Sequence, residues 1–121
     1  MKKIHNRFPD VKFRTISLPY LDGLSPTLES TSMKITEENG ELSRAIGKFR
    51  GMSGEREGIK LTDKEAYNEV TKELLDVVQS AYTMILVLEK QYGIDVEKYQ
   101  ENHIDKLIDK GYIEYVTKKA K

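Results

Sequence analysis

The sequence predicts an all-α fold, an antiparallel helical bundle. Apolar side chains recur at helical intervals in three segments, and residues typical of helix ends bound each segment. The segments run from Ser25 to Arg50, from Thr62 or Asp63 to Tyr92, and from Asp95 to Gly111. Three amphipathic helices make a poor closed core, so we expect identical chains to associate and complete the bundle as a homo-oligomer.

The first segment has a helix start followed by an apolar stripe. Ser25 is in position for an N-cap, Pro26 suits the first helical position, and Glu29 completes a capping pattern. An apolar residue then recurs every seven positions, at Leu28, Ile35, Leu42 and Phe49. That period places these residues on one face of a helix.

The second and third segments have clear boundaries. A glycine-rich stretch, residues 51–58, separates the first two helices and has little to bury. Gly93 is a suitable terminator for the second helix, Asp95 opens the third, and Gly111 closes it. The second helix is apolar on all sides from Met84 to Leu88, which predicts burial between chains.

The chain ends form two arms around the helical core. We divide a single domain of 121 residues into an N-terminal arm, residues 1–24, a helical core, residues 25–111, and a C-terminal tail, residues 112–121. Side chains alternate for a few residues after Val11 and again from Tyr112 to Val116, so both arms are expected to be extended.

Composition excludes several classes of function. Twenty basic residues balance twenty acidic ones, so no net charge attracts nucleic acid or anionic lipid. The absence of cysteine excludes disulfides and thiolate metal sites. The N-terminus lacks the apolar run of a signal peptide, and no apolar stretch is long enough to span a bilayer. We therefore expect a cytoplasmic protein without nucleic-acid or membrane partners.

Two pairs of carboxylates dominate the polar pattern, Glu38 with Glu41 and Glu73 with Asp76. The spacing within each pair places both acids on one helix face, with Cβ atoms about 5–6 Å apart. Glu38 and Glu73 fall nearest the apolar faces, where a free carboxylate is costly unless it is paired or bound to metal. Hard oxygen ligands in this number suit Mg²⁺, with Mn²⁺ as the second choice.

A solvated acidic surface is the alternative that spacing alone leaves open. Charged residues make up 33% of the chain, and carboxylates on helices are commonly solvated. Lys34 and Lys72 lie one turn from Glu38 and Asp76 and could pair with them without any metal. A di-iron centre would need histidines three residues after glutamates, and neither histidine follows that pattern.

The acids stand in two short motifs, EENGE at residues 37–41 and ELLD at residues 73–76. Together these motifs resemble the EExxE…ExxD signature of the all-α nucleoside triphosphate pyrophosphohydrolases. That superfamily includes MazG-like enzymes, dimeric dUTPases and phosphoribosyl-ATP pyrophosphohydrolase. The similarity covers about residues 27–113. The interval between the motifs, residues 42–72, is longer than usual in the family, which suggests an insertion in the glycine-rich stretch.

The resemblance implies a Mg²⁺-dependent enzyme that cleaves a nucleoside triphosphate, or a related nucleotide, between its α- and β-phosphates. It implies four metal ligands, which are Glu38, Glu41, Glu73 and Asp76. Glu37 is the candidate for orienting or deprotonating the attacking water, a role that it could exchange with Glu38. A non-catalytic helical interaction or regulatory module on the same scaffold is the alternative function.

Residues outside the acid motifs complete the expected site. Asn102 and Lys106 lie one turn apart on the third helix, and the resemblance makes them candidate contacts for base, sugar or phosphate. Lys48 is a candidate phosphate contact, although a cation near a helix end also suits the helix dipole without any ligand. Glu69 either supports the ligands or is solvated. Family members commonly form dimers or dimers of dimers, and a tetramer is expected here before a dimer.

Overall fold

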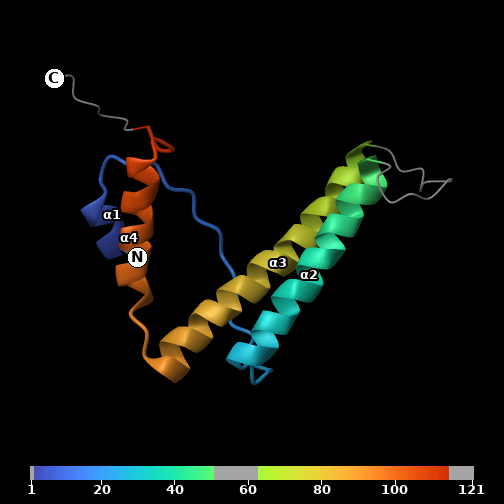
Figure 1. Cartoon of the computed structure of the whole chain (residues 1–121), viewed down its shortest axis with the longest axis horizontal. Coiled ribbons are helices and arrows are strands. Elements are labelled where there is room, and N and C mark those ends of the chain that lie inside the picture. Colours follow the sequence, from blue (N-terminus) through green and yellow to red (C-terminus); the bar gives the residue numbers. More distant parts are fainter. Residues whose placement is uncertain (1, 51–62, 115–121) are drawn as a thin grey trace. The chain divides into compact units, whose positions relative to one another are not determined.

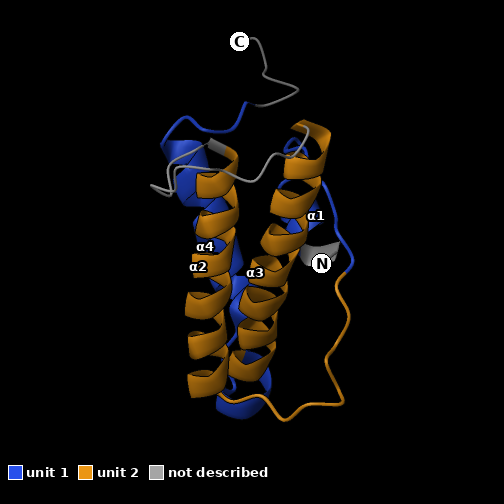
Figure 2. Cartoon of the chain, turned by 90° about the vertical axis from the view of Figure 1, so that its right-hand side faces the viewer, with its two compact units in different colours: residues 1–17, 89–121 blue, residues 18–88 orange. Residues whose placement is uncertain are grey.

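The computed structural model describes residues 2–50 and 63–114, so the glycine-rich stretch lies outside the described residues. Within these ranges the chain forms four helices and no strand, which confirms the all-α prediction (Figure 1). The helices are α1 (Lys2–Arg7), α2 (Leu28–Arg50), α3 (Asp63–Tyr92) and α4 (Val96–Asp109). The chain divides into two compact units, which are unit 1, Met1–Ser17 with Glu89–Lys121, and unit 2, Leu18–Leu88 (Figure 2).

The start of α2 is set by Thr27. The Ser30 amide donates to Thr27 Oγ1 at 3.0 Å, and the Thr27 amide donates to Ser30 Oγ at 2.9 Å. This reciprocal pair satisfies amides at the helix start that no helical carbonyl can reach. The prediction that Ser25 caps the helix is therefore wrong, because Thr27 and Ser30 form the capping pair instead.

The end of α3 and both ends of α4 lie where the sequence predicts them. Gly93 follows α3 with a φ of 64°, and Gly111 follows α4 with a φ of 77°. Glycine adopts this left-handed conformation without steric cost. Asp95 caps α4, because its carboxylate accepts a hydrogen bond from the Lys98 amide at 3.2 Å. The predictions for these three residues are confirmed.

Unit 1 has a small apolar core between α1 and α4. Its buried residues are Ile4, Phe8 and Ile104, with Val11, Ile108 and Ile113 packed against them. The expectation of an extended N-terminal arm is wrong for α1. Ile4 and Phe8 are four residues apart, so a helical turn places both side chains against Ile104. Residues 12–20 have no regular secondary structure, so no strand forms after Val11.

Unit 2 contains two antiparallel helices, α2 and α3 (Figure 1). Phe49, near the end of α2, meets Tyr67, near the start of α3, edge to face with ring centroids 5.1 Å apart. The Gln79 side chain on α3 donates to the Pro19 carbonyl at 3.1 Å. This hydrogen bond ties the segment that precedes α2 to α3.

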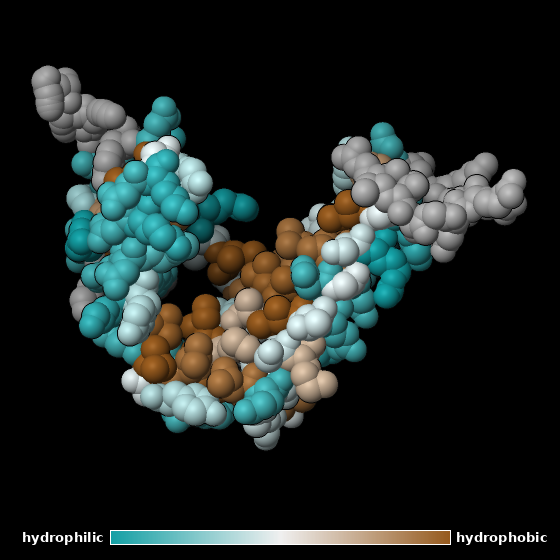
Figure 3. Space-filling view, viewed as in Figure 1, coloured by the Kyte–Doolittle hydropathy of each residue, from teal (hydrophilic) through white to brown (hydrophobic). Residues whose placement is uncertain are grey.

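Large apolar side chains remain exposed along unit 2. Among its described residues only Ala66 and Val87 are buried hydrophobics. The exposed side chains on α3 include Tyr67, Leu74, Leu75 and Ile85. In the view of Figure 3, hydrophobic residues gather along α3. Such a face is typical of an interface, but association of identical chains stays a prediction. None of the described helices has the length and hydropathy needed to cross a membrane.

Candidate metal centre

A row of largely polar residues runs along each of the sides of α2 and α3 that face each other. Their residues recur at alternating intervals of three and four positions, which keeps them on one side of each helix. On α2 they are Thr31, Lys34, Glu38, Glu41, Ala45 and Lys48, and on α3 they are Ala66, Glu69, Glu73, Asp76, Ser80 and Thr83. We call these two rows the polar seam. Paired helices ordinarily place apolar residues at such positions, so packing alone does not explain the composition of the seam.

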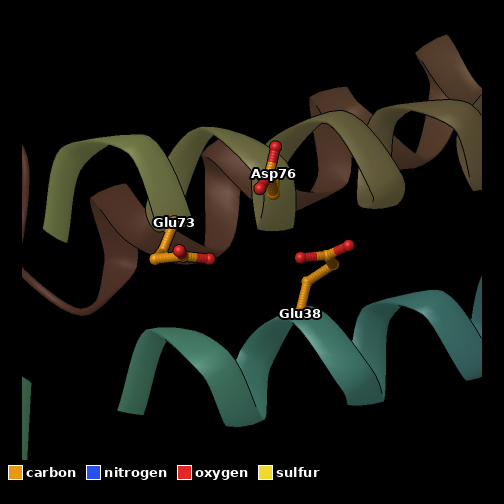
Figure 4. A group of neighbouring side chains, drawn as sticks. All are labelled: Glu38, Glu73 and Asp76. Carbon is orange, nitrogen blue, oxygen red and sulfur yellow. The ribbon is translucent and has the colours of Figure 1, made fainter. Parts of the chain in front are cut away.

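Three carboxylates from the two helices converge at the middle of the polar seam (Figure 4). Glu38 extends from α2 towards Glu73 and Asp76 on α3, and one oxygen atom from each residue lies within 4.8 Å of the others. We call these residues the carboxylate cluster. The fold thus brings together three of the four acids that were predicted as metal ligands.

Two of these carboxylates have buried oxygen atoms without hydrogen-bond partners. The Glu38 side chain is only 12% exposed. The Oε1 atoms of Glu38 and Glu73 are buried, and neither accepts a hydrogen bond within the described part of the chain. Leaving a buried polar group unsatisfied costs about 1–3 kcal/mol, and more when the group is charged. Such oxygen atoms are expected in a site whose ligand is a cation.

Lys34 neutralises the edge of the carboxylate cluster but not its centre. Lys34 Nζ lies 3.2 Å from Glu37 Oε1 and 3.3 Å from Glu38 Oε2. The hydrogen bond to Glu37, followed by that to Glu38, raises the pKa of Lys34. Lys72 pairs with Glu69 at 3.2 Å and not with the cluster. Pairing with lysine therefore accounts for one oxygen of Glu38 and leaves the buried Oε1 atoms unpaired.

Glu41 lies beside the carboxylate cluster on α2. The charge of Glu38 raises the pKa of Glu41 above its ordinary value, and partial burial and the charge of Glu73 act in the same direction. A cation held by the cluster would favour the ionised form of Glu41. Glu41 therefore belongs to the same electrostatic environment, while its role as a metal ligand stays a prediction.

The carboxylate cluster suits Mg²⁺ in the type of its donor atoms, and the distances between its oxygen atoms are close to those around a bound Mg²⁺ ion. Its donors are carboxylate oxygens, which hard divalent cations prefer. Mg–O distances are about 2.0–2.1 Å, so oxygens on opposite sides of one ion are about 4.2 Å apart. A small side-chain rotation would bring oxygen atoms that lie within 4.8 Å of one another to that separation. Glu38, Glu73 and Asp76 could therefore hold a divalent cation.

The other predicted site residues of unit 2 lie around the cluster. Glu37 is exposed and accepts a hydrogen bond from Lys34 at 3.2 Å. Lys48 lines a cavity in the polar seam together with Glu41 and Glu73. The structure thus places Lys48 in the same groove as two of the predicted ligands.

Asn102 and Lys106 belong to unit 1. Both are exposed on α4. Their four-residue spacing places them on one side of that helix. Their contact with a nucleotide stays a prediction.

Arg44 is a cavity residue that the sequence analysis missed. It lines the same cavity as Lys48, between α2 and α3. The signal was present in the spacing, because Arg44 follows Glu41 by three residues and precedes Lys48 by four. That spacing lets all three residues reach the same cavity, with Arg44 at the exposed edge of the polar seam.

The cluster and its cavity lie within a known domain. Residues 26–111 match the MazG nucleotide pyrophosphohydrolase domain. The chain belongs to this family. No curated protein and no solved structure matches it. The MazG match confirms the resemblance drawn from the two acid motifs and implies a nucleotide substrate, and the carboxylate cluster, which could hold a divalent metal, agrees with it.

Proposed function

We propose that the protein is a Mg²⁺-dependent nucleotide pyrophosphohydrolase, with Mn²⁺ as the alternative cation. It hydrolyses a (d)NTP or related nucleotide between the α- and β-phosphates and releases a nucleoside monophosphate and pyrophosphate. The observation that carries the proposal is the convergence of Glu38, Glu73 and Asp76 inside a MazG domain. The buried oxygen atoms without partners add to it, since a cation would satisfy them.

Four acids are assigned as metal ligands, Glu38, Glu41, Glu73 and Asp76. A polyphosphate is strongly anionic, so an acidic seam repels it unless positive charge lies between them. Mg²⁺ supplies that charge, lowers the pKa of a bound water and stabilises the phosphate oxygens. The four acids hold the cation and fix its position along the seam. Their mutual repulsion, which is unfavourable in the free chain, favours cation binding.

Glu37 is assigned to the attacking water. It stands next to Glu38, and its exposed carboxylate is within reach of a solvent-side water. Such a carboxylate can orient the water or accept its proton. Glu38 is the second candidate for this role. In the free chain Lys34 holds Glu37 by a hydrogen bond of 3.2 Å, so Glu37 would exchange this partner for the water.

Asn102, Lys106 and Lys48 are assigned as nucleotide contacts. The position of Lys48 in the seam cavity supports its contact with phosphate. The assignment of Asn102 and Lys106 is supported by their exposure and by the family resemblance of the helix that carries them.

We also propose that the active form is a homo-oligomer, with a tetramer favoured over a dimer. The support is the apolar surface of α3, where Leu74 is 45% exposed and Leu75 is 43% exposed in the single chain. Size-exclusion chromatography with light scattering measures the mass directly. A monomer at micromolar concentration would contradict this assignment.

A panel of nucleotides tests the proposed activity. The purified protein is incubated with each (d)NTP and Mg²⁺, and the products are identified by phosphorus NMR. We expect pyrophosphate and a nucleoside monophosphate from at least one nucleotide, with no reaction in EDTA. Orthophosphate as the first product would show cleavage at a different bond. The absence of turnover with every nucleotide would favour the non-catalytic interaction module.

A further inference from the structure

Two cavities of different chemistry flank the carboxylate cluster along the polar seam of unit 2. One, of about 360 Å³, lies towards the end of α2, and its charged lining residues are two cations, Arg44 and Lys48, and three acids, Glu41, Glu69 and Glu73. The other, of about 310 Å³, lies towards the start of α2 and is lined by apolar and hydroxyl side chains with Lys34. Both volumes are in the range of small-molecule sites. The cluster thus lies between a cavity that holds both cations and carboxylates and a largely neutral cavity.

The first cavity, which we call the basic cavity after Arg44 and Lys48, suits phosphate once a bound cation neutralises the carboxylates that also line it. Arg44 and Lys48 make no hydrogen bond or ion pair within the described residues, so both are free to bind an anion. Arginine forms paired hydrogen bonds to phosphate oxygens, and lysine adds a mobile positive charge. Ala45 and Ala66 also line this cavity, and their small side chains leave room between the helices.

The second cavity, which we call the hydroxyl cavity, suits a nucleoside. Leu21 and Leu24 form an apolar wall that belongs to the segment before α2. Ser25 and Ser80 line it with hydroxyl groups that make no hydrogen bond within the described part of the chain. Among the described residues that line it, only Lys34 is charged. Apolar surface with a few free polar groups is typical of sites that bind ring systems.

The wall of the hydroxyl cavity is attached to α3. Gln79 donates to the Pro19 carbonyl at 3.1 Å and to Thr83 Oγ1 at 3.4 Å. Thr83 is itself buried and donates to the Gln79 carbonyl at 2.8 Å. The segment before α2, assigned from the sequence as part of the N-terminal arm, therefore completes a cavity beside the cluster.

The order of charges along α2 matches the order of groups in a nucleoside triphosphate. With a rise of about 1.5 Å per residue, Lys34 lies about 6 Å from Glu38 along the helix in one direction. Arg44 lies about 9 Å from it in the other direction. Lys34 borders the hydroxyl cavity and contacts Glu38, so it is placed beside a phosphate that follows the nucleoside. Arg44 and Lys48 are placed beside the terminal phosphates.

We propose that the nucleotide lies along the polar seam in one direction, with its nucleoside in the hydroxyl cavity and its β- and γ-phosphates at Arg44 and Lys48. The inference rests on the proposed function and adds the direction of the substrate. A water oxygen bonds to phosphorus as the P–O bond between the α-phosphate and the leaving pyrophosphate breaks. One proton of the water passes to a carboxylate. The pyrophosphate is left in the basic cavity and the nucleoside monophosphate in the hydroxyl cavity.

Product binding to variants of the full chain tests this direction. Pyrophosphate and the nucleoside monophosphate of the best substrate are titrated separately in Mg²⁺ by calorimetry. We expect Arg44→Ala and Lys48→Ala each to weaken pyrophosphate binding about tenfold, because each variant loses about one charged hydrogen bond. Monophosphate binding should stay unchanged. Ser80→Leu, which fills the hydroxyl cavity, should weaken monophosphate binding and spare pyrophosphate.

Matched variants on the outer surface of unit 2 serve as controls. Lys64→Ala removes an exposed cation from α3, and Ser43→Leu adds the same bulk on the exposed side of α2. Both should bind the two products as the parent chain does, and thermal unfolding checks that every variant is folded. If Arg44→Ala and Lys48→Ala weakened only monophosphate binding, and Ser80→Leu only pyrophosphate binding, the substrate would lie in the opposite direction and the inference would be wrong. Equal weakening of both products by each variant would also overturn the inference.

The binding experiment separates this inference from the proposed hydrolysis. Product binding needs no turnover, so nucleotides of all bases can be tried as monophosphates if no substrate is found. If the protein hydrolysed a nucleotide but the variants did not weaken the two products selectively, the proposed direction would be wrong and the proposed function would stand. The expected split without turnover would support the direction of a bound nucleotide and contradict hydrolysis. Binding of neither product would overturn the inference.

Discussion

The two units differ in the side chains that lie between their helices. In unit 1, Ile4, Phe8 and Ile104 bury apolar surface against one another. In unit 2, the facing sides of α2 and α3 carry carboxylates, and the Oε1 atoms of Glu38 and Glu73 are buried without partners. Apolar burial stabilises unit 1 without any ligand. The polar seam has an unfavourable electrostatic term that a bound cation would remove, so stability and function are expected to depend on different residues.

Neutral substitution in the carboxylate cluster should have the largest effect on activity. Glu38→Gln and Asp76→Asn remove a charged ligand while keeping the shape of the side chain. Loss of a group that only supports a metal ligand costs about 10–100-fold, so loss of a ligand should lower turnover by at least about 100-fold. The metal-free variants should be as stable as the parent chain or more stable, because repulsion decreases. Steady-state kinetics and thermal unfolding in EDTA measure both.

An exposed acid on α3, the helix of Asp76, provides the control for these two substitutions. Glu89→Gln on α3 lies away from the cluster in sequence and should change turnover little. Near-normal turnover of Glu38→Gln or Asp76→Asn would contradict the ligand assignment. A large loss of stability in EDTA would show instead that these acids hold the fold together.

Truncation in the apolar core of unit 1 should lower the stability of the chain and leave metal binding unchanged. Ile104 is 6% exposed between Ile4 and Phe8, and an Ile→Ala change in such a site lowers the unfolding free energy by about 2–5 kcal/mol. Ile104→Val should lose about 0.5–1.5 kcal/mol. Both should keep the increase in unfolding free energy that Mg²⁺ gives the parent chain. Urea unfolding with and without Mg²⁺ measures the two quantities, and equal stability of Ile104→Ala and the parent chain would contradict the core assignment.

Metal binding should stabilise the chain by an amount that depends on the cluster. Mg²⁺ at about one hundred times its dissociation constant adds about 2.7 kcal/mol to the unfolding free energy. For a domain of this size, that raises the melting temperature by about 10 °C. Glu38→Gln should lose most of this shift. A shift of the same size in Glu38→Gln would mean that Mg²⁺ binds elsewhere.

The smallest expected effect is the pH dependence of the metal-free chain. Glu38 first, then burial and Glu73, raise the pKa of Glu41 in the folded state. The folded chain therefore binds the Glu41 proton more tightly than the unfolded chain, so this contribution to stability grows as the pH falls and is lost as the pH rises. Glu41→Gln should melt above the parent chain at about pH 7, and this difference should shrink towards about pH 4. A constant difference in EDTA across that range would contradict the proposed repulsion.

Much of the local structure could be predicted from the sequence because it depends on neighbouring residues. Gly93, Asp95 and Gly111 mark helix ends through their own backbone preferences and caps. The misplaced start of α2 shows the limit of this reasoning, since Ser25 and Thr27 both have hydroxyl groups suited to a cap. Only Thr27 has Ser30 at the spacing that lets the two residues exchange hydrogen bonds.

Helix α1 could not be predicted from its own residues. A helix of six residues is too short to be stable alone. Ile4 becomes buried only because Phe8 and the distant Ile104 lie against it. Arg44 is a similar case, since its spacing was visible but its importance follows from the cavity that α2 and α3 form together.

The sequence by itself determined the kind and spacing of the acids, and therefore that two pairs of carboxylates lie on the faces of two helices. Only the tertiary structure decided that Glu38, Glu73 and Asp76 meet, that Lys34 pairs with Glu38, and that cavities of unlike chemistry flank the cluster. The physical reason is that helical periodicity arises from hydrogen bonds between near neighbours. The alignment of α2 on α3 depends on contacts between residues that are far apart in the chain.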